Sequence, residues 1–239
     1  IINPFVQEGE TISFPEKISF LLATDLEKLP IYGMLHTDKG LKYKKTNSNI
    51  FVSSDNIDKT LLPYQGKGAS VISFGGGLDS LALLGLFPNL TIIHEAPDDK
   101  MTDSTSGEKC NQDSIGIVKL IQQVKALCRN KNYTIFTNSK TLTEPIGWTT
   151  WISCIATSLL LANDLGTTNI VLGSSMGSLL KSCAKFRQNG LEFPQNSIWA
   201  NLLEKSAHIK LVTPILGLSE LSLIKLVDHR LLNYAIWCD

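Results

Sequence analysis

The sequence predicts an α/β fold with a doubly wound, mostly parallel sheet of Rossmann-like type and a small β-rich N-terminal region. From about residue 69 onward, short β-branched apolar runs alternate with stretches of helical spacing, which is typical of parallel sheets. The first of these runs enters a triple glycine, a turn suited to joining a strand to a helix. Before residue 69, turn residues separate short strand-like runs instead. We therefore expect a β-rich region at 1–68 and an α/β domain at 69–239.

The composition limits the classes of protein to which this chain could belong. The chain has 239 residues, 43% of them hydrophobic, which is enough for a packed core. Its 22 basic and 22 acidic residues balance, so the net charge does not favour a nucleic-acid-binding protein. The five cysteines are dispersed, unlike a disulfide framework, and no apolar run has the length of a membrane-spanning helix. We expect a cytoplasmic protein with reduced thiols and no membrane partner.

The N-terminal region carries no motif to which a function can be assigned. Strands are expected at Ile12–Phe14, Ile18–Leu22 and Ile50–Val52, because these runs are β-branched or aromatic and turn residues flank them. The segment Lys39–Lys45 concentrates basic residues, and we interpret it as a solvated hairpin turn. Residues Gln65–Gly68 are the expected linker to the α/β domain.

The α/β domain is expected to alternate strands and helices along its length. Its predicted elements, in order, are a strand at Val71–Phe74, a helix to Leu86, a strand at Leu90–His94, a polar loop from Pro97 to Asn111, a helix at Ile115–Cys128, a strand at Tyr133–Phe136, a helix at Trp148–Leu165, a strand at Ile170–Leu172, and a further helix at Ser197–Ser206. Ligands of such sheets bind beyond the carboxyl ends of the strands. The segments that follow the four strands should therefore converge on one site.

The stretch from Ser73 to Ser80 is the strongest candidate for that site. It runs Ser73, Phe74, Gly75, Gly76, Gly77, Leu78, Asp79, Ser80, and predicts a strand end, a tight glycine loop and a helix start. Glycines let backbone N–H groups approach a ligand, and the helix N-terminus behind them favours phosphate. The loop lacks the Lys-Ser/Thr of a Walker A motif, and its glycine spacing is not the Rossmann one. A ligand-free structural turn is the alternative.

Two further segments could contribute to nucleotide binding. Gly173, Ser174 and Ser175 follow the fourth predicted strand, where small polar residues could donate to phosphate or form an ordinary loop. His94 ends the second predicted strand and could border the nucleotide or pack in the core.

Catalytic groups are expected among charged residues close to these loops. Asp79 could help to hold Mg²⁺, cap the helix, or do both. Lys185 and Arg187, which we favour over Lys181, could neutralise charge that develops on phosphate in adenylyl transfer. Surface solvation is the alternative for these cations.

The glycine stretch resembles the pyrophosphatase loop (PP-loop) of the ATP pyrophosphatases, whose consensus is Ser-Gly-Gly-x-Asp-Ser/Thr. Gly76, Gly77, Asp79 and Ser80 match it, whereas Gly75 stands where the family usually has serine. The resemblance implies the PP-loop (HUP) variant of the Rossmann-like fold, with ATP and Mg²⁺ bound at the loop. It also implies adenylation of a carboxyl or carbonyl oxygen with loss of pyrophosphate, followed by displacement of AMP by ammonia or an amine.

The C-terminal part is similar to the 7-cyano-7-deazaguanine synthase (QueC-like) branch. Lys210–Glu220, followed by an apolar helix to Val227, matches the strand, proline and turn that precede the last helix there, with Glu220 where lysine is commoner. The resemblance implies that Cys238 is the first ligand of a zinc site, and that homodimers are common. Residues 174–182 lack the acidic residues of that branch, so we expect a changed carboxylate acceptor, either a small molecule, a modified base or a protein terminus.

Two other functions stay open on the sequence. A tRNA-modifying PP-loop enzyme is disfavoured by the balanced charge and by the lack of a Cys-x-x-Cys pair. A non-catalytic nucleotide-binding module that regulates a partner is favoured by Gly75 in place of serine.

Overall fold

The chain divides into two compact units, residues 1–65 with 198–209 and residues 66–197 with 210–239. The computed structural model describes residues 11–14, 17–27, 31–37, 40–46, 51–53, 57–60, 64–97, 109–137, 151–177 and 198–235. Helix α8 (Ile198–Ala207), which follows the first four strands of the α/β domain in sequence, is grouped with the N-terminal unit.

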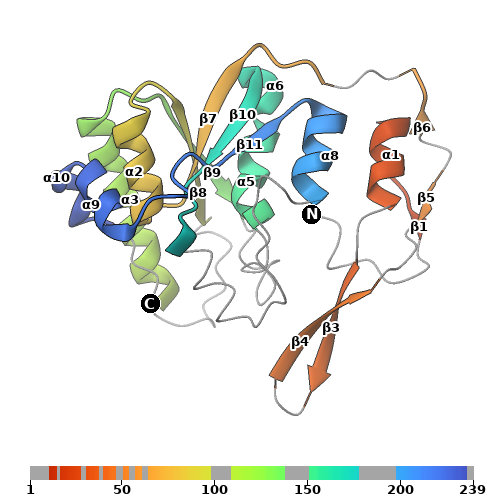
Figure 1. Cartoon of the computed structure of the whole chain (residues 1–239), viewed down its shortest axis with the longest axis horizontal. Helices are drawn as coiled ribbons and strands as arrows, with labels where there is room; N and C mark the ends of the chain where they lie inside the picture. Colours follow the sequence, from red (N-terminus) through yellow and green to blue (C-terminus); the bar gives the residue numbers. More distant parts are fainter. Residues whose placement is uncertain are drawn as a thin grey trace. The chain divides into compact units, whose positions relative to one another are not determined.

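The larger unit is built on a five-stranded sheet in which every neighbouring pair is parallel. Its strands are β7 (Ala69–Phe74), β8 (Thr91–Pro97), β9 (Asn132–Thr137), β10 (Thr167–Leu172) and β11 (Lys210–Val212). Their order across the sheet is β11-β10-β7-β8-β9 (Figure 1). The chain therefore starts in the middle, winds to one edge through β9, and returns to the other side of β7. This order is Rossmann-like, and its switch point lies between β7 and β10.

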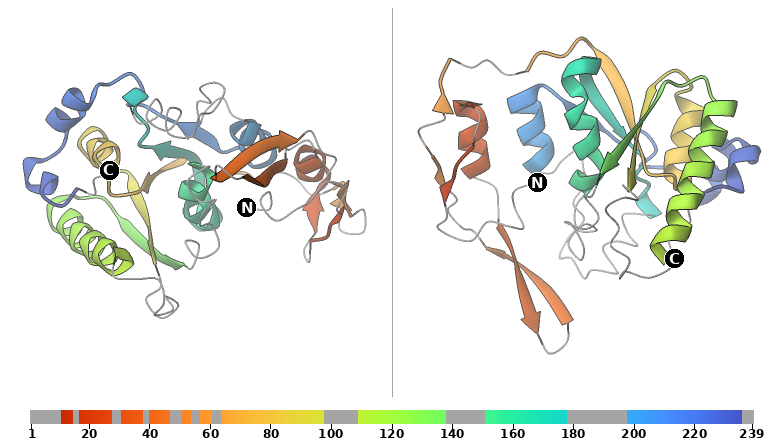
Figure 2. Two further views of the ribbon diagram at one scale, coloured as in Figure 1. Left: turned by 90° about the horizontal axis from the view of Figure 1, so that it is seen from below. Right: turned by 180° about the vertical axis from the view of Figure 1, so that it is seen from behind.

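Helices cover both faces of this sheet, which confirms the doubly wound α/β architecture. One layer contains α2 (Leu78–Leu86), α3 (Lys109–Leu127), α9 (Glu220–Leu226) and α10 (His229–Leu232). The other layer contains α5 (Trp151–Leu160) and α6 (Ala162–Leu165) (Figure 2). None of the described helices has the length and apolar character needed to span a bilayer.

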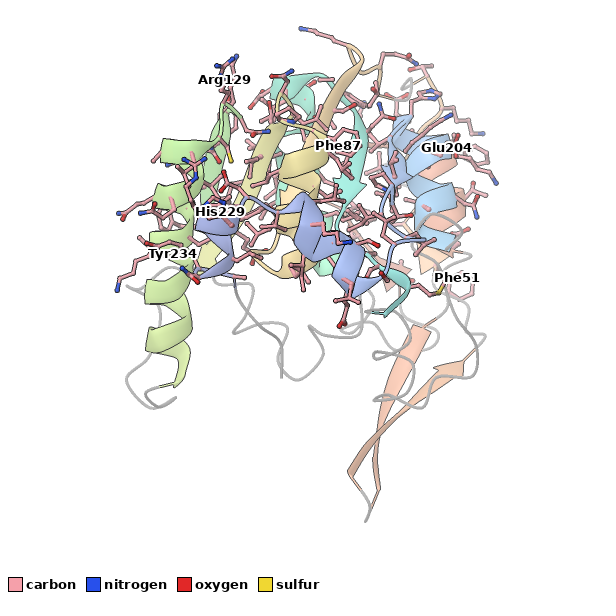
Figure 3. All side chains as sticks on the ribbon, turned by 60° about the vertical axis from the view of Figure 1, so that its left-hand side comes forward. Phe51, Phe87, Arg129, Glu204, His229 and Tyr234 are labelled. Atoms are coloured by element: carbon pink, nitrogen blue, oxygen red, sulfur yellow. The ribbon has the colours of Figure 1, made fainter. Side chains whose placement is uncertain are left out.

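Helix α2 lies at the centre of the hydrophobic core. Five consecutive residues, Ser80 to Leu84, are buried, so nearly every side of the helix is covered. A helix that is apolar all round is buried between layers, and here the sheet lies on one side and α9 on the other. Figure 3 shows the side chains of this helical layer with α9 and α10 in the foreground. The buried core around α2 includes Ile72, Phe74, Ile92, Leu120, Val124, Val171, Ile215 and Leu223.

Several element boundaries differ from the sequence-based prediction. Strand β8 continues three residues beyond His94, and α3 begins at Lys109, so the expected loop from Pro97 to Asn111 overlaps both elements. The long helix expected at Trp148–Leu165 is interrupted at Leu161, where α5 ends and α6 starts. The expected helix at Ser197–Ser206 and the strand at Lys210 are confirmed as α8 and β11.

Among its described residues, the smaller unit contains short strands and two helices. Its strands are β1 (Thr11–Ile12), β2 (Ile18–Ser19), β3 (Ile31–Thr37), β4 (Gly40–Thr46), β5 (Phe51–Val52) and β6 (Ile57–Asp58). The strand expected at Ile18–Leu22 is wrong beyond Ser19, because α1 (Phe20–Glu27) starts at the next residue. Ser19 Oγ accepts a hydrogen bond from Leu22 N at 3.2 Å, so this serine caps the helix that the apolar run forms.

The basic segment of this unit lies in a hairpin, but most of it belongs to a strand and not to the expected turn. Strands β3 and β4 pair antiparallel, with Thr37 opposite Gly40 and Ile31 opposite Thr46. Three lysines of the predicted basic segment therefore belong to the second strand of the hairpin, and the turn itself falls outside the described residues.

Candidate functional site

The glycine loop joins β7 to α2 at the switch point of the sheet. Gly76 has φ of +81°, a conformation that side chains strongly disfavour, and it lets the chain reverse direction within one residue. Gly77 is the N-cap of α2, and its carbonyl accepts the first helical hydrogen bond, from Leu81 N at 3.0 Å. The N–H groups that precede Leu81 therefore point beyond the end of the helix. A loop of this kind presents backbone donors and a positive dipole end to an anion.

The peptide bond that opens the loop is held by a side chain from the helix. Gly75 N donates to Ser80 Oγ across 3.2 Å, and Ser80 is buried. The hydroxyl oxygen thus acts first as an acceptor for the loop backbone. Ser80 keeps its own hydroxyl proton as a donor.

Asp79 links the glycine loop to the loop that follows β10. Its Oδ2 accepts from Ser175 N at 3.2 Å and from Ser175 Oγ at 3.1 Å. The expectation that Asp79 caps the helix is wrong, because Gly77 holds the cap position and Asp79 is the second helical residue. Its negative charge still lies in the first turn, where it interacts favourably with the helix dipole.

The loop after β10 lies directly against the start of α2. A Cβ added to Gly173 would come within 2.8 Å of Ser80 N, so a side chain larger than glycine does not fit there. Ser175 is 1% exposed, whereas Ser174 is only partly buried. The next residue, Met176, donates from its N–H to Leu216 O at 2.9 Å, which ties this loop to the turn after β11. The loops after β7, β10 and β11 therefore meet, as the sequence predicted for the first two.

His94 lies inside β8 and not at its end, which corrects the sequence-based boundary. Its side chain is 2% exposed, and its Nδ1 lies 3.0 Å from Phe74 O, at the last residue of β7. Its ring meets the Phe74 ring edge to face, with centroids 6.2 Å apart. These contacts fit the packing alternative, and they place the imidazole beside Phe74, the last residue before the glycine loop.

Glu220 lies close to the site, although its position in the sequence did not predict this. A Cβ added to Gly177 would lie 3.6 Å from Glu220 Oε1 and 3.9 Å from Ser175 Oγ, so the first residue of α9 reaches the loop after β10. The only signal in the sequence was the strand–turn–helix that places Glu220 at a helix start beyond β11. Two carboxylates, those of Asp79 and Glu220, thus lie close to this loop.

Other expected site residues fall outside the described part of the chain. Lys181, Lys185, Arg187 and Cys238 belong to this group. Among the residues that the structure does describe, no group of three or more His, Cys, Asp or Glu side chains could hold a metal ion. The segments that follow β8 and β9, which were expected at the same site, are not described either.

Comparisons with known proteins add no further assignment. No protein-family model matches the sequence, and a search of curated proteins found no match.

Proposed function

We propose that the chain is an ATP-dependent adenylating enzyme of the PP-loop, QueC-like type, with the pyrophosphate portion of ATP bound at residues 75–80. One observation carries the proposal. Asp79, in the first turn of the helix behind a glycine loop, hydrogen-bonds Ser175 across the switch point of a parallel sheet. Ligands of open α/β sheets bind at that point, and glycine loops before a helix N-terminus favour phosphate.

The proposed reaction has two steps that form one C–N bond. A carboxylate oxygen of the acceptor attacks the α-phosphorus of ATP, the bond to the bridging oxygen breaks, and pyrophosphate leaves. Ammonia or an amine then attacks the activated carbonyl carbon, and AMP leaves. Such chemistry requires positioning and charge neutralisation more than a nucleophilic side chain.

The glycine loop and the charged candidates have defined parts in this proposal. The glycine loop and Ser80 hold the phosphates, and Asp79 supplies a carboxylate of the kind that Mg²⁺ prefers as a ligand. Lys185 and Arg187 would neutralise charge on the α-phosphate. A zinc site that begins at Cys238 belongs to the same proposal, as implied by the resemblance alone.

The direct test measures nucleotide products with Mg²⁺, ammonia and a panel of carboxylic acids. We expect AMP and pyrophosphate from the wild-type chain and neither from Asp79→Ala. Asp164→Ala is the matched control, because Asp164 is an exposed carboxylate in the first turn of α6, the helix that leads into the opposite end of β10. Steady production of ADP and phosphate instead would contradict the proposed adenylation.

A second function, a nucleotide-binding module without turnover, is favoured by Gly75. The geometry makes this residue testable, because a Cβ there would meet only Ser80 Oγ at 3.8 Å, and Gly75 is not among the glycines with positive φ. Gly75→Ser should therefore fold normally and add one hydroxyl donor to the loop. A gain in AMP and pyrophosphate formation over wild type would support an enzyme with a weakened loop. Tight ATP binding without turnover in both proteins would support the module.

A further inference from the structure

The peptide bond between Phe74 and Gly75 is held at both of its polar ends. Its carbonyl oxygen lies 3.0 Å from His94 Nδ1, and its N–H donates to Ser80 Oγ across 3.2 Å. In a trans peptide these two groups point in opposite directions, so two partners on opposite sides fix the rotation of the peptide plane. This is the plane at which the chain leaves β7 and enters the glycine loop.

From this geometry we infer that His94 is a positioning residue for the glycine loop and makes no contact with the ligand. The side chain is 2% exposed and lies in a strand with a neighbour on each side. A carbonyl oxygen can only accept a hydrogen bond, so the ring nitrogen nearest to it must carry a proton. The neutral ring is then the Nδ1–H tautomer, which the edge-to-face contact with Phe74 keeps in orientation.

The orientation of the peptide between Phe74 and Gly75 affects the glycines that follow it in the loop. Gly76, with its positive φ, comes one residue after the fixed peptide, and Gly77 caps the helix after that. A change in the plane of the first peptide would redirect the N–H groups of both. His94 thus sets the direction of the donors that the proposed function assigns to phosphate. This link to the nucleotide rests on the proposed function, whereas the positioning of the loop does not.

The first test needs no variant and no ligand. Long-range ¹H–¹⁵N correlation spectra separate protonated from unprotonated ring nitrogens. The chain has four histidines, so the His94 signals are assigned by their loss in a His94→Asn spectrum. We expect a protonated Nδ1. An Nε2–H tautomer would overturn the inference, because Nδ1 could then not donate to Phe74 O.

The second test measures amide hydrogen exchange of residues 74–80 in three variants. His94→Leu removes the donor, His94→Asn keeps an amide donor close to the position of Nδ1, and Ile93→Val is a neighbouring buried change without a polar group. We expect exchange in the loop to rise by about ten- to a hundredfold in the leucine variant, the factor that a buried unsatisfied carbonyl implies. The asparagine variant should recover part of this protection, and the valine variant should keep it. Equal protection in all three would refute the positioning role.

ATP titration of the same proteins separates this inference from the proposed function. If the wild type binds ATP, its affinity should fall in His94→Leu and partly recover in His94→Asn. If the wild type binds no nucleotide, the proposed function fails, while the tautomer and the exchange rates still decide whether His94 positions the loop.

Discussion

Replacing Gly173 by alanine tests whether the loop after β10 really packs on the backbone of α2. The added Cβ would lie 2.8 Å from Ser80 N, 2.9 Å from Asp79 C and 3.1 Å from Ser80 Cα. Carbon atoms in contact prefer about 3.5–4.0 Å, and the atoms met here are backbone, which cannot rotate away. Either the loop or the buried helix must move. Overpacking of this kind costs about 1–3 kcal/mol, or about 2–12 °C in Tm at about 2–4 °C per kcal/mol for a chain of this size.

Gly217→Ala is the matched control for this substitution. Gly217 also lies in a turn that follows a strand of the same sheet, but a Cβ there would meet nothing within 4 Å, and its φ is not positive. We expect its stability to be unchanged or raised by up to about 1 kcal/mol, because alanine restricts the unfolded chain. Urea unfolding followed by circular dichroism measures both variants. Equal midpoints for Gly173→Ala and Gly217→Ala would refute the close approach of the two segments, and with it the basis for placing Ser175 beside Asp79.

Two further predictions concern the helical layer on the α2 side of the sheet. Gly85→Ala should destabilise the fold by about 1–3 kcal/mol, because its Cβ would overlap the Leu226 carbonyl. Gly116→Ala should instead stabilise the fold by about 0.5–1 kcal/mol, because a Cβ has open space there in the middle of α3. Thermal unfolding compares the two variants. Hydrogen bonds from Arg230 hold the pKa of Asp228 well below its ordinary value, so the stability that Asp228 contributes is complete above about pH 4 and is lost as the pH falls through the lower, folded-state pKa. Asp228→Asn should therefore flatten the acid side of the stability profile measured by urea unfolding, and an unchanged profile would count against the contribution.

The architecture was predictable because its signals are local and repeated. The run Ile170–Leu172 is apolar over its whole length, and Val71–Phe74 is apolar except at Ser73, which is typical of strands buried on both faces. Their alternation with helical spacing then indicates a parallel sheet. The order of the strands was not predictable in the same way, since nothing local in the sequence says that β10 returns to the free side of β7.

The predicted ends of helices and strands were wrong where local interactions outweigh the hydrophobic pattern around them. The run from Ile18 to Leu22 is strand-like in composition, but the Ser19 hydroxyl accepts the Leu22 N–H and starts a helix. The long apolar helix breaks at Leu161, where no glycine or proline marks the interruption. Composition averages over such residues, so an error of a few positions is expected at each end.

The sequence predicted which segments form the candidate site, but it did not predict the side-chain contacts between them. The glycine loop, Asp79 and the loop after β10 could be placed at one edge of the sheet from strand ends alone. The bond from Asp79 to Ser175 depends on a side-chain direction, which strand order does not specify. His94 was predicted at the end of its strand, but β8 continues three residues beyond it and places it in the strand interior. The approach of Glu220 to Gly177 depends, like the Asp79–Ser175 contact, on a side-chain direction.

The three glycines of the loop do different things, and this bears on how much the departure at Gly75 matters. Gly76 has a positive φ, so its lack of a side chain is a requirement of the backbone. Gly77 has φ of −75° and ψ of 171°, an extended conformation open to any residue at a helix cap. Gly75 has room for a Cβ, with only Ser80 Oγ within 4 Å. The backbone conformation thus demands glycine at one position of the three. Since serine fits at position 75, its absence is a difference in the chemistry that the loop offers and not a consequence of its shape, and Gly75→Ser can measure that difference without disturbing the turn.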